Sequence, residues 1–322
     1  MATPGGHYSL IISTMSYFQN MTLNELHDRF CSEAAHINNL TKDTVRWYRD
    51  GFSILQTFKP LRHLHEIDEL ILTDFLLWGR EHRNWKPKTM LDYYGSLSSF
   101  FNWCENKRLI PKNPLKHIPR PKIPRTIPKA LSETEARQVL ESVQYLPVPK
   151  TYRHPTFHKK RDIAIFATFL FTGLRRQELL NLKLHDVNFE EAIVVVRSGK
   201  GQKDRIIPLS FELKRLLQAY LEERSKLGID TEYIFTSLQK QKKLGVRTLT
   251  RMFQRVKEAS RVNFTTHQLR HTFATLMAES QCDAFALCDM MGHSDIKTTM
   301  VYVKTRSEHK RKQINNHPLN YL

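Results

Sequence analysis

Six prolines lie close together near the middle of the chain, and they constrain the fold more than any other feature of the sequence. They fall between Lys107 and Lys129, together with eight lysines or arginines and no acidic residue. Because proline interrupts helices and central strands, the segment is expected to be extended and to separate two domains. Its uniform positive charge would suit a strap along a phosphate backbone, although its composition fits a solvated linker equally well.

The residues before this segment repeat apolar side chains at helical spacing. A stripe of aromatic and leucine side chains between Lys88 and Asn106 is typical of a helix that faces a core. Two threonines are expected to be N-caps of the helices before it. These are Thr41, before a helix over 42–57, and Thr73, before a helix over 73–83. The pattern predicts a small helical domain over 21–110 that follows a weakly ordered lead-in over 1–20.

After the linker, over 111–129, the pattern again predicts helices. Ser132 and Glu135 have the spacing of a capping box, and the helical pattern continues to Leu182 apart from a polar loop near 146–160. The apolar period then changes to that of strands, which predicts a hairpin. Its arms are Ala192–Arg197 and Arg205–Leu209, and further helices are expected over 211–227, 247–260 and from Thr266. The second domain, 130–322, is therefore expected to be mostly α with one small antiparallel sheet.

Charge and cysteine content narrow the function classes. The 322 residues carry a net charge of +18, which points to a polyanionic partner; nucleic acid is the first candidate and a membrane surface the alternative. The four cysteines form no CxxC pair, so buried free thiols are expected. The apolar stretch Leu10–Ile12 is too short to cross a membrane, which leads us to expect a cytoplasmic protein.

Four short segments of the second domain carry chemically active residues in a fixed order. They are Thr172-Gly173-Leu174-Arg175, Gly199-Lys200-Gly201, His267-Gln268-Leu269-Arg270-His271, and Gly292-His293-Ser294 followed by Tyr302. This order resembles the signature of the tyrosine site-specific recombinases of the phage-integrase and Xer type. The resemblance covers nearly all of the chain after residue 20. It implies a helical core-binding (SAM-like) domain, a linker, and a mixed α/β catalytic domain of the tyrosine recombinase type.

The chemistry of these residues supports the resemblance. A phosphodiester under attack gathers negative charge on its non-bridging oxygens, and the guanidinium groups of Arg175 and Arg270 can each meet that charge with two donors. His267 would share a helix face with Arg270, and His293 would add a donor. A tyrosine ionises at about pH 10, so it needs such a positive field to become a nucleophile. Among the tyrosines, Tyr302 is selected by its position after the Gly292 turn. It is expected about two turns along the next helix, for which Ser294 is the expected cap.

Several residues have a supporting or contested assignment. Glu178 lies one turn after Arg175 and is expected to pair with it. Lys200 is the lysine that the resemblance favours as a proton donor, with Lys203 as its rival. His267 and His271 have the spacing of a zinc pair, but Gln268 supplies no carboxylate and Arg270 would place a cation beside the metal. We therefore expect no metal and no cofactor, and we assign His271 to packing or support.

The resemblance implies an enzyme that cleaves and rejoins double-stranded DNA without metal or ATP. Tyr302 would form a 3′-phosphotyrosine, and His267 would accept its proton. Four subunits, of this chain alone or together with a related recombinase, would assemble on two sites, joined by the tail over 307–322. Two alternatives stay open: a type IB topoisomerase that only relaxes DNA, and a DNA-binding protein without catalysis. The sequence does not identify the DNA site, the biological role, the direction of exchange or accessory proteins.

Overall fold

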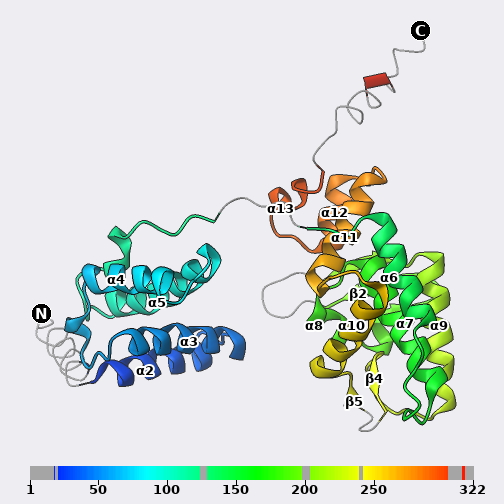
Figure 1. Cartoon of the computed structure of the whole chain (residues 1–322), viewed down its shortest axis with the longest axis horizontal. Coiled ribbons are helices and arrows are strands. Elements are labelled where there is room, and N and C mark those ends of the chain that lie inside the picture. The colour runs from blue at the N-terminus through cyan, green and yellow to red at the C-terminus, as the bar shows by residue number, and fades with distance from the viewer. Residues whose placement is uncertain are drawn as a thin grey trace, which may run out of the picture. The chain divides into compact units, whose positions relative to one another are not determined.

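A computed structural model describes Phe18 and residues 21–123, 129–197, 204–238, 242–303 and 314–315. The chain divides into two compact units, residues 1–125 and 126–322, and each is considered by itself (Figure 1). The lead-in over 1–20, apart from Phe18, lies outside the described residues. So do Lys200, Lys203 and all of the tail after Ser307 except residues 314–315.

The first unit is helical. Its helices are α2 (Leu23–His36), α3 (Lys42–Phe58), α4 (Glu69–Glu81) and α5 (Pro87–Asn106), with short 3-10 turns at Leu64–Glu66 and Pro114–His117. Thr41 caps α3 as predicted. The expected cap at Thr73 is wrong, because Asp68 accepts a hydrogen bond from the Ile71 amide and starts α4 one turn earlier. Thr73 lies inside the helix, where its hydroxyl donates to the Glu69 carbonyl at 2.8 Å.

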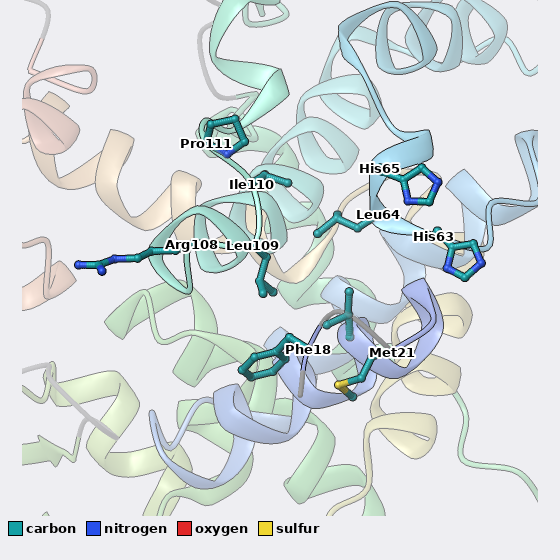
Figure 2. A pocket seen from close by; sticks show the side chains of 10 residues that line it. Phe18, Met21, His63, Leu64, His65, Arg108, Leu109, Ile110 and Pro111 are labelled. Carbon is teal, nitrogen blue, oxygen red and sulfur yellow. The ribbon is translucent and has the colours of Figure 1, made fainter. Parts of the chain in front are cut away.

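Aromatic side chains fill the core of this unit. Phe100 and Phe101, both from the stripe predicted in α5, are fully buried, and Phe18 packs edge-on against Trp103. Burying an aromatic side chain removes about 150 to 250 Å² from water, so a few such residues supply most of the apolar burial. A cavity of about 420 Å³ opens beside this core (Figure 2). Its lining includes Met21, His63, His65, Leu109 and Ile110.

The basic segment is not extended along its whole length. Leu115 and Ile118 are buried in the core of the first unit, and the Tyr94 hydroxyl donates to the carbonyls of both residues, at 2.8 and 3.3 Å. The Asn113 side chain caps the 3-10 turn Pro114–His117, which contains Leu115. Because two apolar side chains anchor it, the first half of the segment is part of the helical unit. Residues 124–128 lie outside the described residues.

The second unit places helices around a small sheet. The helices are α6 (Glu133–Tyr145), α7 (Pro155–Thr172), α8 (Arg176–Asn181), α9 (Phe211–Lys226), α10 (Val246–Ser260), α11 (Thr266–Glu279), α12 (Ala284–Met291) and α13 (Ile296–Met300). The strands β1 (Val187–Asn188), β2 (Ile193–Val196) and β3 (Arg205–Pro208) form an antiparallel sheet in the order β1-β2-β3. A second pair, β4 (Thr236–Ser237) and β5 (Lys242–Lys243), was not predicted.

Most of the sequence-based elements of this unit are confirmed. Ser132 and Glu135 form the capping box of α6, and β2 pairs with β3 in the register Val194 to Ile207. The polar loop is shorter than expected, because Pro155 occupies the first position of α7 and starts that helix there. The second half of α7 is buried on all sides from Ala164 to Leu170, and the helix packs against α6, α9 and α11, so it forms the centre of the core.

Two further findings concern the whole described part of the chain. None of its helices combines the length and the apolar character needed to cross a membrane. The four cysteines are free; Cys31 and Cys104 are buried, as expected, whereas Cys282 and Cys288 are only partly buried.

Candidate active site

The described residues of the predicted site come from three turns of the second unit and from α11, which carries His267, Arg270 and His271. The first turn ends α7 at Gly173, whose φ is +61°, a conformation that side chains disfavour. A Cβ atom there would lie 2.4 Å from Cδ1 of Phe273, so a larger residue would also clash. The turn buries Leu174 and makes Arg175 the first residue before α8. Glycine therefore allows the chain to deliver Arg175 to a fixed place.

Glu178 is shared by two arginines. Its Oε1 accepts from Arg175 Nη1 at 2.8 Å and from Arg205 Nη1 at 3.0 Å, and its Oε2 accepts from Arg205 Nη2 at 2.7 Å. The backbone amide of Arg175 also donates to Oε2, at 2.7 Å. Burial alone would raise the pKa of Glu178, but the bonds and charges of Arg205 and Arg175 outweigh it and hold that pKa at about 2. The predicted Arg175–Glu178 pair is confirmed.

Arg270 is held from both sides by backbone carbonyls. Its Nη1 donates to Gly173 O at 2.7 Å, and its Nη2 donates to Met291 O. The residue is 5% exposed. Burial, followed by the charge of Arg175, lowers its pKa to about 10, which leaves it positive at neutral pH. A guanidinium has five N–H groups, so two carbonyls fix its orientation without exhausting its donors.

The second turn follows α12 and carries His293. Gly292 has a φ of +62°, and its carbonyl accepts from Arg175 Nη2 at 3.3 Å. His293 Nδ1 lies 2.8 Å from the Thr299 hydroxyl. Burial, and then the charges of Arg270, Arg175 and Arg205, lower the pKa of His293 to about 4. A neutral ring that accepts from Thr299 at Nδ1 carries its proton on Nε2, where it can donate to an anion.

The third turn holds Tyr302. The expected cap at Ser294 is wrong, since Asp295 caps α13 by accepting from the Lys297 amide at 2.9 Å. Tyr302 was expected on that helix, but α13 ends at Met300 and Tyr302 lies in the turn after it. Its ring packs against a small apolar cluster that includes Phe273. Burial raises the pKa of Tyr302, and the charge of Arg270 opposes that change.

The hydroxyl of Tyr302 has a partner that the sequence did not suggest. His271 Nδ1 forms a short hydrogen bond with it. Burial, and then the charges of His267 and Arg270, lower the pKa of His271, so its ring is neutral and can accept the phenolic proton. His267, the predicted proton acceptor, is exposed in the first turn of α11. The two histidines are thus four residues apart on one helix, and His271 is the one at the hydroxyl.

Arg205 is the residue that sequence reasoning missed. It is the first residue of β3, and its side chain is 2% exposed. Along β3 the burial alternates, so Arg205 shares the inner face with Ile207. The sequence carries no clear signal of this, because Ile206 and Ile207 are both apolar and do not show which face of the strand points inward. A buried arginine needs a partner, and Glu178 is the nearby carboxylate.

Together these residues form a site with an excess of positive charge. Within the described part of the chain, three guanidinium groups, those of Arg175, Arg205 and Arg270, surround the single carboxylate of Glu178. Such an excess at a partly buried place favours an anion with several acceptor oxygens, as a phosphate has. The cavity beside the first unit's core contains none of these residues (Figure 2).

The pairing of Glu178 makes a prediction about stability. The pKa of Glu178 in the folded chain, about 2, lies below the ordinary value of 4.5. Its ionised form therefore adds to the free energy of unfolding above pH 4.5, and this contribution is lost as the pH falls toward 2. Glu178→Gln should therefore be less stable than the wild type at pH 7, by about 3 kcal/mol, and this difference should shrink at pH 3. Urea denaturation at the two pH values measures it. An equal difference at both would contradict the ionised, doubly paired carboxylate.

Comparison with known proteins places the second unit in a known family. Residues 129–309 match the model of the phage integrase family. The chain is 38% identical over 194 residues to the tyrosine recombinase XerA of Thermococcus onnurineus, covering 60% of this chain and 64% of that protein. It therefore spans less than two thirds of the length of that relative. With the tyrosine recombinase XerD of Xanthomonas axonopodis pv. citri it is 30% identical over 305 residues, 90% of this chain and 95% of that protein.

Two solved structures share the fold. The Tn1549 transposon integrase in complex with a circular intermediate DNA matches with a TM-score of 0.70 and 20% identity, covering 91% of this chain and 99% of that chain. A lambda integrase dimer bound to a COC′ core site matches with a TM-score of 0.69 and 20% identity, covering 89% of this chain and 97% of that chain. At this level of identity the structures support the mostly helical fold with its small antiparallel sheet.

Proposed function

The chain belongs to the phage integrase family of tyrosine recombinases, and from this premise we propose that it is a site-specific DNA recombinase. It cleaves and rejoins DNA strands through a covalent 3′-phosphotyrosine at Tyr302. The observation that carries the proposal is the placement of Arg270: two backbone carbonyls hold its guanidinium, and its charge acts on the Tyr302 hydroxyl. An oriented cation beside a nucleophile is what attack on a phosphodiester requires.

The residues of the site divide the steps of the reaction among them. The Tyr302 oxygen attacks the phosphorus and forms the new P–O bond while the bond to the 5′ oxygen breaks. Arg175, Arg270 and His293 donate to the non-bridging oxygens, where the charge gathers. The resemblance assigns the phenolic proton to His267, although His271 is the histidine in contact with the hydroxyl. Lys200 gives a proton to the departing 5′ oxygen. A 5′-hydroxyl of the partner strand then attacks the phosphotyrosine, which restores the DNA and frees Tyr302.

The two histidines of α11 give a prediction that separates their roles. His267→Phe should slow cleavage by about 10²- to 10⁴-fold, the usual contribution of a general base. His271→Phe should slow it by only about tenfold, because it removes one hydrogen bond that orients the phenol, worth about 1.4 kcal/mol. Single-turnover cleavage of a nicked duplex measures both. The reverse order would assign the proton transfer to His271, whose Nδ1 already contacts the hydroxyl.

Lys200 gives a second prediction for this site. An alkoxide leaves poorly unless it is protonated, whereas a thiolate leaves readily without an acid. Lys200→Ala should therefore cleave normal DNA very slowly and DNA with sulfur at the 5′-bridging position almost as fast as the wild type does. Lys203→Ala, tested in parallel, is the control. Sulfur rescue at Lys203 and not at Lys200 would show that the other lysine of the loop is the acid.

The proposed binding partners follow from the same family membership. The helical domain 21–110 and the catalytic domain 130–322 each bind duplex DNA, and the basic linker 111–129 joins the two domains. Four subunits assemble on two sites, with a related recombinase as a possible member, and the tail of each chain contacts a neighbour. The solved relatives bound to DNA support the DNA partner. A cytoplasmic location is proposed because a DNA recombinase must reach the DNA of the cell.

One experiment separates the proposed activity from the two alternatives. A duplex site selected from randomised DNA by binding to the purified chain is placed twice in a plasmid. A recombinase should exchange the two sites and should leave a plasmid without sites unchanged. A topoisomerase would relax both plasmids, and a DNA-binding protein without catalysis would bind the site and yield neither product.

A further inference from the structure

Arg205 links two parts of the second unit that are far apart in the sequence. Its Nη1 and Nη2 donate to the two oxygens of Glu178 in a bidentate pair, at 3.0 and 2.7 Å. Its Nε donates to the carbonyl of Met290, at 2.8 Å. Glu178 belongs to α8, and Met290 lies at the end of α12. One guanidinium therefore fixes the distance between α8 and α12.

Both of these helix ends carry residues of the site. Glu178 holds the side chain and the backbone amide of Arg175. The carbonyl next to Met290, that of Met291, accepts from Arg270. The chain continues through Gly292, where a Cβ atom would lie 2.9 Å from Cδ of Arg205, to His293. A displacement of Arg205 would thus be transmitted to Arg175, Arg270 and His293 together.

The charge of Arg205 matters in addition to its geometry. With Arg205, three guanidinium groups face one carboxylate, which leaves an excess of two positive charges. Attack by a tyrosine oxygen on a phosphodiester produces a transition state with about two negative charges, one more than the DNA phosphate in the ground state. Without Arg205, Glu178 would neutralise Arg175 alone and the excess would fall to one. The loss would weigh on the transition state more than on binding.

We infer that Arg205 is a positioning residue for DNA cleavage: its buried guanidinium holds Glu178 and the end of α12 together, and so aims Arg175, Arg270 and His293 at one phosphate. This inference rests on the proposed function and deepens it. Arg205 acts through its neighbours and has no need to touch DNA. Lysine cannot replace it, because an ammonium group lacks the planar fork that binds both carboxylate oxygens and a carbonyl at once.

The test compares Arg205→Lys with a matched control in the same unit. Arg161 is also buried, 4% exposed in its side chain, and pairs with Asp162 at 2.8 Å, but it belongs to none of the three turns of the site. Each variant is checked for folding by thermal unfolding, and single-turnover cleavage is measured at saturating DNA. Arg205→Lys should bind DNA within about threefold of the wild type and cleave about 100-fold more slowly. Arg161→Lys should cleave at the wild-type rate.

A double variant tests whether Arg205 acts through Glu178. If it does, Arg205→Lys combined with Glu178→Gln should cleave faster than the product of the two single losses predicts, whereas independent effects would multiply. If Arg205→Lys does not fold, Arg205→Met with Glu178→Gln removes both buried charges at once and is tested for the same slow cleavage. Wild-type cleavage rates in these variants would overturn this inference alone. Absence of any adduct with the wild-type chain would overturn the proposed function together with it.

Discussion

Tyr302→Phe is expected to bind its DNA site with wild-type affinity and to form no covalent adduct. The phenyl ring keeps the packing against the cluster that includes Phe273, so the fold and the binding surface stay intact. Only the oxygen that attacks phosphorus is lost. Because the covalent step has no other route in the proposed mechanism, the expected effect is complete loss of adduct.

The measurement for this variant uses a nicked duplex, which traps the protein on DNA after one cleavage. The adduct is counted on a denaturing gel, and binding is measured separately by a mobility shift. Tyr94→Phe is the matched control, since it also removes one hydroxyl, here one that donates to Leu115 and Ile118. An adduct formed by Tyr302→Phe would show that another residue is the nucleophile.

Arg175→Ala and Arg270→Ala are expected to give the second largest effect. Removing one oriented donor from the oxygens of a transition state costs about 10²- to 10³-fold in rate. Each substitution also removes a full positive charge from the site. We therefore expect the cleavage rate to fall by about 10³-fold, which corresponds to a rise of about 4 kcal/mol in activation free energy. Affinity for the site should change little, because many other contacts contribute to binding.

The control for the arginine variants is Arg215→Ala. Arg215 is exposed on α9 and pairs with Glu212 at 2.6 Å. Its replacement by alanine therefore removes one positive charge from the chain and leaves the site unchanged. Because Arg270 is buried between two carbonyls, Arg270→Lys is added to keep a cation there if the alanine variant unfolds. Cleavage within about tenfold of the wild type, a loss of about 1.4 kcal/mol, in both alanine variants would show that these residues do not hold the phosphate.

Features set by neighbours in the sequence could be predicted. The Arg175–Glu178 pair follows from a spacing of one helical turn, and the capping box of Ser132 and Glu135 has a recognisable pattern. The strands β2 and β3 follow from short runs rich in valine and isoleucine. Each of these features depends on residues that are only a few positions apart.

Features set by contacts across the fold could not be predicted in the same way. His271 meets Tyr302 across 31 residues, and Arg205 meets Met290 across 85. No short pattern encodes such contacts, and an arginine in a basic chain is most often a solvated charge. The caps of α4 and α13 were misplaced for a different reason. A second capping side chain, Asp68 five residues before Thr73 or Asp295 next to Ser294, competes for the same role.

The central claim is that one tyrosine of eleven becomes joined to DNA. The most direct test is to trap the adduct on a nicked duplex that carries the selected site, digest the DNA and the protein, and sequence the nucleotide-linked peptide by mass spectrometry. We expect a single modified peptide, in which the oxygen of Tyr302 is bonded to the phosphate at the 3′ end of the cleaved strand. A phosphate attached to any other residue, or to the 5′ end, would contradict it.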